Sequence, residues 1–253
     1  MTRLDGLRVV VTSPTPAASE VSDLLDDRGA VVVPLPVFEI AEPSTWGPLD
    51  DALERLDEFT WLLFTSRNGV QGFSGRLGDR VLPDDLKTAA VGAATAEALE
   101  RSRTTADFIP QVFTGADLVA GLGEPRGRVL LVRVEDGPPA TPEALRGRGW
   151  DVAEVAAYRN VPLDPSSDEA AAVRSGDFDA VTLMSPSAAR GFARVMAGGP
   201  LLGSVVVACI GPSTARGATQ AGLRVDVVAA RHTAEGLVEA LAGALEGSRE
   251  VGP

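Results

Sequence analysis

Short turns rich in serine, threonine and glycine carry the residues of this sequence that are best suited to bind a ligand. The turns lie at 12–14, 65–69, 92–95, 185–187 and 211–214, and each leads from an apolar stretch into a helical pattern. Such a turn exposes backbone N–H groups at the positive end of a helix, which suits carboxylates or phosphates. For any single turn, the alternative that its Ser or Thr only caps the following helix stays open. The candidate binding residues are Thr12, Thr65, Ser66, Asn68, Gly69, Gly92, Ala93, Thr95, Ser185, Pro186, Ser187, Gly211, Pro212, Ser213 and Thr214.

Few side chains could act as an acid, a base or a nucleophile. Tyr158 is the single Tyr of the chain, and its hydroxyl could serve as an acid or hydrogen-bond donor, unless it is only a half-buried linker residue. Arg133 and Tyr158 each end an apolar stretch, and we expect both to face a binding cleft. Cys209 lies inside an apolar run and is expected in the core, whereas His232 precedes a helix cap and is expected at the surface. One Cys and one His exclude an internal disulfide and multi-His zinc sites, so we expect no metal.

Composition narrows the function classes. With 45% hydrophobic residues the chain can form real cores, and a net charge of −12 argues against generic binding to nucleic acid or anionic lipid. Its apolar runs are far shorter than the ~20 residues needed to cross a bilayer, and residues 1–6 lack a signal-peptide core. We therefore expect a cytoplasmic, soluble monomer that binds neither nucleic acid nor a membrane.

Apolar stretches alternate with amphipathic helical patterns along the chain, which is typical of parallel α/β architecture. Thr114 and Thr233 begin two of the helical patterns, and we expect both to be helix caps. The expected strands are 7–12, 30–35, 59–64, 88–91, 107–110, 128–133, 151–158, 179–184, 205–210 and 224–228.

The sequence also repeats itself. Ser66 recurs as Ser185, 119 residues on, and most matches in the second half of the repeat keep this offset. Near the start the offset is 120, as for Arg8 and Arg128. A register held to within one residue over most of the chain indicates a duplication.

The duplication yields four segments, and the connections between them predict how they pair. The connection at 122–128 has the length of a turn inside one α/β domain, whereas those at 36–47 and 159–167 are longer and contain proline. We therefore expect two interleaved flavodoxin-like domains, each with a parallel five-stranded sheet. The expected boundaries are 1–35 plus 163–253 for a discontinuous domain, 42–157 for a continuous domain, and 36–41 and 158–162 for the linkers.

Five motifs occur together in a fixed order and spacing. They are Phe64-Thr-Ser-Arg-Asn-Gly-Val70, Val91-Gly-Ala-Ala-Thr-Ala96, Tyr158-Arg159, Ile210-Gly-Pro-Ser-Thr-Ala215 and Thr233-Ala-Glu-Gly-Leu237. Each motif is weak when taken alone, but the ordered set closely resembles the uroporphyrinogen-III synthase family over essentially the whole chain. The resemblance implies two flavodoxin-like domains, joined by a two-stranded linker, with the site in the cleft between them.

The same resemblance implies a cofactor-free lyase reaction of tetrapyrrole and heme biosynthesis. Linear hydroxymethylbilane, which carries eight carboxylates, loses water and closes to a macrocycle with its last pyrrole ring inverted through a spiro intermediate. The family likeness places substrate carboxylates at 65–70, which adds Val70 to the candidates, and at 185–187 and 211–214. It assigns Tyr158 the role of assisting departure of the hydroxyl. The uncatalysed closure gives the other isomer, so the task of the enzyme is largely geometric.

Departures from the family pattern keep alternatives open. Ser13 stands where the family commonly has Arg, and Glu135 and Asp136 would oppose an anionic ligand. One alternative is a non-catalytic tetrapyrrole- or anion-binding regulatory module on the same scaffold, which turnover of hydroxymethylbilane would distinguish. Another is a flavodoxin-like mononucleotide-binding protein, which bound flavin absorbance would support. The absence of Gly-x-Gly-x-x-Gly and Gly-x-x-x-x-Gly-Lys motifs weakens dinucleotide and P-loop hypotheses.

Overall fold

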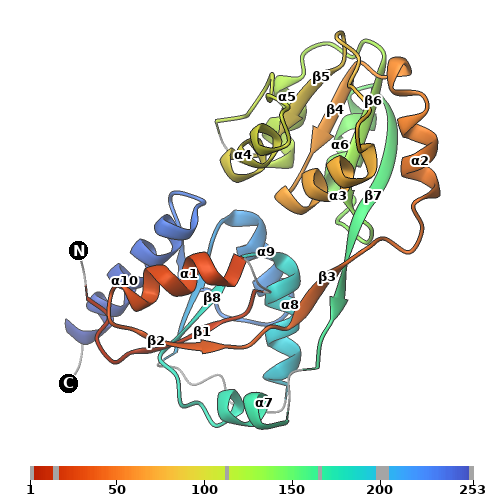
Figure 1. Cartoon of the computed structure of the whole chain (residues 1–253). Coiled ribbons are helices and arrows are strands. Elements are labelled where there is room, and N and C mark those ends of the chain that lie inside the picture. Colours follow the sequence, from red (N-terminus) through yellow and green to blue (C-terminus); the bar gives the residue numbers. More distant parts are fainter. Residues whose placement is uncertain (1–2, 14–16, 112–113, 165–166, 198–204, 251–253) are drawn as a thin grey trace. The chain divides into compact units, whose positions relative to one another are not determined.

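Two α/β units make up the chain (Figure 1). The computed structural model describes residues 3–13, 17–111, 114–164, 167–197 and 205–250. Unit 1 comprises Met1–Glu39 and Val161–Pro253, and unit 2 comprises Ile40–Asn160, so each unit takes part of the two expected linkers. Each unit contains a five-stranded sheet, which confirms the predicted α/β fold with two such sheets. Pro14, in the first candidate turn, lies outside the described residues.

The sheet of unit 1 has the strand order β10-β9-β8-β1-β2, and its strands pair in parallel. Val9 and Val11 pack toward α1 and α10, whereas Val10 packs toward α7, α8 and α9. Successive side chains of a strand point to opposite faces, so these apolar strands are covered by helices on both sides. The elements are β1 (Arg8–Val11), α1 (Ala17–Asp26), β2 (Val31–Pro34), α7 (Ser167–Arg174), β8 (Ala180–Leu183), α8 (Pro186–Val195), β9 (Val206–Cys209), α9 (Pro212–Gln220), β10 (Val227–Val228) and α10 (Ala234–Glu250).

Unit 2 has the strand order β3-β7-β6-β4-β5, with β4 parallel to β5 and β6, and β6 parallel to β7. Leu62 and Phe64 pack toward α2, α3 and α4, whereas Leu63 packs toward α5 and α6 on the other face. The elements are β3 (Phe38–Ala41), α2 (Gly47–Leu53), η1 (Leu56–Glu58), β4 (Trp61–Phe64), α3 (Arg67–Leu77), β5 (Lys87–Ala90), α4 (Ala93–Arg101), α5 (Gly115–Gly121), β6 (Arg128–Val134), α6 (Ala140–Gly147) and β7 (Asp151–Pro162).

The strand registers of the two sheets repeat as the sequence does. Arg8 of β1 lies beside Val31 of β2, and Arg128 of β6 lies beside Asp151 of β7, so both partners move by 120 positions. The pairing of β4 with β6 corresponds in the same way to that of β8 with β1. Because residue-by-residue pairing is preserved, the two units carry the same structural repeat, as expected for a duplication.

One expected strand is wrong. Residues 107–110 form only an isolated bridge, in which Phe108 lies beside Ala89 of β5. Backbone hydrogen bonds join Asp107 and Phe108 to Thr88 and Ala90, and the Asp107 carboxylate accepts further hydrogen bonds from the Thr88 backbone and hydroxyl. Pro110 has no N–H to donate, so it cannot extend this pairing.

The fifth strand of unit 2 is instead β3, which the sequence analysis placed in a linker. It lies beside β7, and β7 itself runs past the expected end at Tyr158 to Pro162. The two strands cross the boundary between the units, because β3 begins at Phe38 and ends at Ala41. The resemblance implied a two-stranded linker, and its strands here are continuous with the sheet of unit 2.

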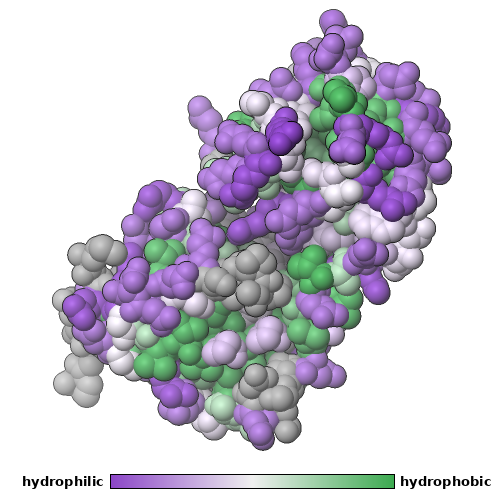
Figure 2. All heavy atoms as spheres, viewed as in Figure 1, coloured by the Kyte–Doolittle hydropathy of each residue, from purple (hydrophilic) through white to green (hydrophobic). Residues whose placement is uncertain are grey.

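Polar and charged side chains cover much of the visible surface of each unit (Figure 2). The large apolar side chains that are exposed among the described residues are Val31, Ile40, Val81, Ile109 and Val228. A few exposed apolar residues are normal at protein surfaces. Among the described residues, no helix is both long and apolar enough to span a membrane.

The strand pairing leads to a prediction about the folding units. We expect residues 42–157 expressed alone to unfold cooperatively, because β4, β5, β6 and most of β7 remain together with the helices on both faces. Residues 1–122 should not, because β1 and β2 would lack β8, and β4 would lack β6. Denaturant titration followed by circular dichroism measures both. Cooperative unfolding of 1–122 with none for 42–157 would contradict the proposed domain boundaries.

Candidate functional site

Tyr158 lies on β7 of unit 2, close to the start of α3. It is 9% exposed, and its hydroxyl oxygen lies 3.0 Å from the hydroxyl oxygen of Ser66. Burial raises the pKa of Tyr158 above its ordinary value, while the hydrogen bond from Ser66 and the charge of Arg133 partly oppose the shift. The phenol therefore keeps its proton at neutral pH and is able to donate it.

The hydroxyl groups that begin α3 and α8 act as helix caps. Ser66 Oγ accepts a hydrogen bond of 3.0 Å from the Gly69 N–H, and Ser185 Oγ accepts one of 3.0 Å from the Ala188 N–H. Thr114 and Thr233 cap α5 and α10 in the same way, so the prediction that both are caps is confirmed. At Ser66 and Ser185 the capping interpretation is thus correct, but it does not exclude a second role.

The helices α4 and α9 begin differently, at a glycine. Gly92 and Gly211 occupy the N-cap positions, and neither helix start receives a side-chain cap. A helix start of this kind presents backbone N–H groups and positive potential without a competing side chain, which favours an anion. Thr95 and Thr214, in the first turns, are nearly buried, whereas Pro212 and Ser213 are exposed.

The candidate turns lie at the carboxyl ends of their strands. In unit 1 they follow β1, β8 and β9, and in unit 2 they follow β4 and β5. Because these strands are parallel within each sheet, the turns of one unit share one edge of its sheet, where ligands bind in open α/β folds. The structure thus brings together Thr65, Ser66, Asn68, Gly69, Val70, Gly92, Ala93 and Thr95 at one edge in unit 2, and Thr12, Ser185, Pro186, Ser187, Gly211, Pro212, Ser213 and Thr214 at one edge in unit 1.

The Thr12 side chain is committed to the fold. Thr12 is fully buried, and its hydroxyl donates a hydrogen bond of 2.9 Å to the carbonyl oxygen of Thr182 on the adjacent strand β8. The Thr182 hydroxyl in turn donates to the Val10 carbonyl at 3.2 Å. These paired bonds tie β1 to β8 just before the turn, so any ligand contact of Thr12 would have to come from its backbone.

Arg133 is also engaged by the protein itself. Its guanidinium donates one hydrogen bond of 2.7 Å to Glu154 Oε2 and one of 2.6 Å to the Pro138 carbonyl. The side chain is only 10% exposed, and Glu154 shares its second oxygen with Arg146 at 2.7 Å. Arg133 therefore anchors the segment that follows β6, and it acts on Tyr158 through its charge.

The acidic residue Glu135, which would oppose an anionic ligand, is turned toward the chain between β3 and α2. Its carboxylate accepts hydrogen bonds from the backbone N–H of Ser44 at 3.2 Å and from the Ser44 hydroxyl at 3.0 Å. The Glu135 backbone N–H donates to the Tyr158 carbonyl at 2.9 Å. Glu135 is thus held by Ser44 through its side chain and by Tyr158 through its backbone, and the second of these bonds fixes the backbone of Tyr158.

His232 makes a contact that the sequence did not indicate. It is half-buried, and its imidazole packs on the start of α9, where a Cβ added at Gly211 would lie 3.2 Å from imidazole Cδ2. No local pattern around His232 signals this, because the contact joins the start of α10 to a turn distant in sequence. Cys209, by contrast, is in the core as predicted, and burial raises the pKa of its thiol to about 11, so it is no nucleophile at neutral pH.

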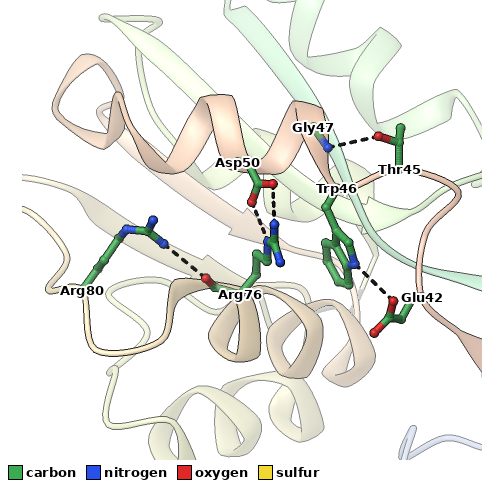
Figure 3. A network of polar contacts seen from close by, with 7 residues as sticks. All are labelled: Glu42, Thr45, Trp46, Gly47, Asp50, Arg76 and Arg80. Atoms are coloured by element: carbon green, nitrogen blue, oxygen red, sulfur yellow. Dashed lines mark hydrogen bonds and ion pairs between the residues drawn. The ribbon is translucent and has the colours of Figure 1, made fainter.

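A cavity of about 450 Å³ lies between α2 and α3 and is lined by Asp50, Glu54, Arg76 and Arg80. Arg76 forms a double ion pair with Asp50, with both distances 2.5 Å, and its guanidinium lies over the Trp46 ring (Figure 3). These contacts fix α2 on α3. Because Arg76 is in the last turn of α3, the cavity lies at the opposite end of this helix from the Ser66 cap.

Among the described residues, no group of three or more His, Cys, Asp and Glu side chains is placed to hold a metal ion. What the edges of the sheets offer are backbone N–H groups at helix starts, hydroxyls, and one protonated phenol. This set suits the binding of anions together with donation of a proton.

Comparisons with known proteins agree on one family. A family model described as uroporphyrinogen-III synthase HemD matches residues 19–239. The uroporphyrinogen-III synthase of Synechococcus elongatus is 31% identical over 94% of this chain and 95% of its own length. That of Chlorobaculum parvum is 29% identical over 94% of this chain and 99% of its own length.

Solved structures show the same fold. A mutant uroporphyrinogen III synthase from the extremely thermophilic bacterium Thermus thermophilus superposes with a TM-score of 0.68 and 19% identity, over 96% of this chain and 100% of its own. The uroporphyrinogen-III synthetase of Helicobacter pylori gives a TM-score of 0.61 and 18% identity, over 94% of this chain and 99% of its own. At these identities the likeness shows the architecture alone.

Proposed function

Because the chain belongs to the uroporphyrinogen-III synthase family, we propose that the turns at the carboxyl edges of its two sheets bind the carboxylates of a linear tetrapyrrole. The activity of the family, and of this chain, is the cyclisation of hydroxymethylbilane, a lyase reaction of porphyrin and heme biosynthesis. The reaction removes water, inverts the last pyrrole ring and closes the macrocycle.

The observation that carries the binding proposal is the repetition of helix starts at the carboxyl edge of each sheet. Ser66 and Gly92 begin helices in unit 2, and Ser185 and Gly211 begin the corresponding helices in unit 1. Each start presents positive potential, so four of them suit a substrate with eight carboxylates. They provide local anion binding in a chain whose net charge is −12.

Tyr158 is proposed as the acid of the reaction. A phenol is ordinarily protonated at neutral pH, and burial, which raises the pKa of Tyr158, favours this state further. In the proposed step this proton passes to the hydroxymethyl oxygen of the substrate, the C–O bond breaks and water leaves. The pyrrole nitrogen lone pair supplies the electrons for the expulsion, so the proton assists a departure that is already favoured.

An assay that separates the type III from the type I product tests the function. Uncatalysed closure gives type I, so we expect the purified protein to divert hydroxymethylbilane to type III. If only type I forms, the proposed activity is wrong. If the protein binds the substrate without turnover, the regulatory alternative would gain its first support.

Single hydroxyl deletions in the turns are expected to weaken binding without abolishing it. Ser185→Ala and Thr214→Ala each remove at most one hydrogen bond to a substrate carboxylate, which costs ~1.5–3 kcal/mol, or about ten- to 150-fold in binding. Asn68→Pro should weaken binding more, because it removes a backbone N–H in the first turn of α3, where a helix tolerates proline. Gly69→Val should also be worse, because a Cβ there lies 3.3 Å from Ser66 Oγ.

Binding of a non-reactive substrate analogue, measured by calorimetry, checks these four variants, with thermal unfolding as the control for the fold. Complete loss of binding in Ser185→Ala or Thr214→Ala with the fold intact would show that the side chains dominate. Equal, partial losses in all four would show that backbone groups have no special part.

We also propose a cytoplasmic location and a monomeric state, without a nucleic-acid partner. The support is the composition of the sequence, above all its net charge of −12, which disfavours phosphate backbones. Light scattering of the purified protein and cell fractionation test the two expectations.

A further inference from the structure

The contact between Ser66 and Tyr158 gives the Tyr158 hydroxyl a fixed partner. Ser66 Oγ lies 3.0 Å from Tyr158 Oη and accepts a hydrogen bond of 3.0 Å from the Gly69 N–H. A serine hydroxyl has one proton and two lone pairs, so the cap uses a lone pair and leaves the proton available. The phenol oxygen lies within reach of that proton.

We propose that Ser66 is a positioning residue for Tyr158, which it serves by donating its hydroxyl proton to the phenol oxygen and thereby leaving the phenol proton for the substrate. The inference rests on the proposed function, in which Tyr158 is the acid. In this role the Ser66 side chain does not donate to a substrate carboxylate. Its proton is used by the Tyr158 oxygen, and one of its lone pairs is used by the Gly69 N–H.

The proton balance of the reaction fixes the direction of this hydrogen bond at the critical moment. The Tyr158 O–H bond breaks, the proton goes to the substrate hydroxyl, and water leaves. The phenolate oxygen is then only an acceptor, so Ser66 must be the donor. Hydrogen bonds to a charged group are stronger than neutral ones, so the contact strengthens as the proton is transferred. The proton that a ring carbon loses on closure of the macrocycle restores the phenol.

Close packing of α3 on β7 brings the two hydroxyls together. A Cβ added at Gly72 of α3 would lie 2.2 Å from the carbonyl oxygen of Ala157, so only glycine allows this approach. The register of β7 also shifts here, because Arg133 pairs with Ala156 but Val134 pairs with Tyr158. This irregularity lies directly before Tyr158, and such a change in register alters the direction in which the following side chain points.

The other half of the duplication contains the packing without the hydroxyl pair. Ser185 caps α8, and a Cβ at Gly191 would lie 2.4 Å from the Val37 side chain, as Gly72 meets Ala157 in unit 2. The offset of 120 that relates Val37 to Ala157 places Phe38 at the position of Tyr158. Phe38 is 7% exposed and belongs to the apolar core of unit 1. Both repeats thus place an aromatic ring at this position and a capping serine at the start of the helix. The hydroxyl that forms a hydrogen bond with the serine is present in Tyr158 and absent in Phe38.

The groups around the Tyr158 phenol determine how its pKa should change when the Ser66 hydroxyl is removed. α3 contributes the Ser66 hydroxyl and β6 contributes the Arg133 charge, and both lower the pKa of Tyr158 against the larger effect of burial. Removing the Ser66 donor leaves the phenolate with less stabilisation. The Tyr158 titration must then move to higher pH.

The chain has a single Tyr, so this titration is measurable without substrate. Growth with 3-fluorotyrosine labels position 158 alone, and fluorine lowers the phenol pKa toward the range in which the protein is folded. Fluorine NMR then follows one resonance. We expect Ser66→Ala and Ser66→Gly to titrate at higher pH than the parent protein, and Ser66→Thr to titrate close to it, because threonine keeps the hydroxyl.

Matched variants separate the hydroxyl from the helix cap. Glycine costs only a few tenths of a kcal/mol at an N-cap relative to serine, so Ser66→Gly removes the donor while it keeps the helix. Ser185→Ala removes the equivalent cap of α8 and should leave the Tyr158 titration unchanged. An unchanged titration in both Ser66→Ala and Ser66→Gly overturns the inference. A shift in Ser185→Ala as large as in Ser66→Ala overturns it as well, because cap loss would then explain the effect.

Activity supplies the second readout. We expect Ser66→Ala and Ser66→Gly to lower kcat by about tenfold with little change in KM, as for the loss of one stabilised transition-state contact. In the Tyr158→Phe background, Ser66→Gly should have no further effect on kcat, because its role acts through the phenol. Additive losses would overturn the inference. If the parent protein forms no type III product, the proposed function fails, whereas the fluorine titration still decides the role of Ser66.

Discussion

Tyr158→Phe is expected to lower turnover by about 10²-fold while the product remains the type III isomer. General acid assistance contributes typically ~10²–10⁴-fold, and the lower end applies because the pyrrole nitrogen helps to expel the hydroxyl. The Tyr158 hydroxyl has one protein partner of known geometry, Ser66 at 3.0 Å, and its raised pKa keeps it protonated. The substitution removes the donor and leaves the ring, so the packing beside α3 should persist.

Steady-state kinetics and separation of the isomers measure this result, with denaturant unfolding as the control for stability. Phe38 shows that a phenylalanine is accommodated at the equivalent position of the repeat, so unfolding is not the expected cause of a loss. Retention of parental turnover with type III product would make Tyr158 a linker residue. Catalysis would then be almost wholly positional, as substrate orientation alone can be worth a large part of a barrier.

The two-sheet architecture could be predicted from sequence because it follows from local patterns and one duplication. Strands such as 128–133 and 179–184 are largely apolar without strict alternation, as expected for parallel strands covered on both faces. The connection at 122–128 has the length of a turn inside one α/β domain, and it therefore predicted that the segments on either side of it share a domain. β3 escaped prediction because a strand of four residues with charged Glu39 has no clear pattern of its own.

The candidate site could be predicted only as a set of turns, because the partner of each side chain is distant in sequence. The Thr12 hydroxyl donates a hydrogen bond to the Thr182 carbonyl on the neighbouring strand, and no pattern around Thr12 indicates this contact. Arg133 is held by Glu154 and the Pro138 carbonyl, although its place at a strand end predicted that it faces a binding cleft. Strand register and helix packing determine such contacts, and both emerge only in the folded chain.

Gly72 is the site of the second substitution for which we expect a large effect. Gly72→Ala is expected to destabilise the protein by about 1–3 kcal/mol, the usual range for overpacking, because the new Cβ would lie 2.2 Å from a backbone carbonyl of Ala157 that cannot rotate away. To relieve the clash α3 must move off β7, which separates Ser66 from Tyr158. Turnover should therefore fall together with stability, and the Tyr158 titration should move to higher pH.

Gly75→Ala is the matched control, because the same helix carries Gly75 at a position where an added Cβ meets nothing within 4 Å. Alanine is favoured over glycine in a helix interior by roughly 0.5–1 kcal/mol, so Gly75→Ala should stabilise the protein and leave turnover and the Tyr158 titration unchanged. Denaturant unfolding and kcat of the two variants measure the contrast. If Gly72→Ala instead unfolds at the same denaturant concentration as the parent and keeps full turnover, close packing of α3 on β7 does not hold Ser66 against Tyr158. The hydroxyl pair would then need another support than the one that the backbone contact between Gly72 and Ala157 provides.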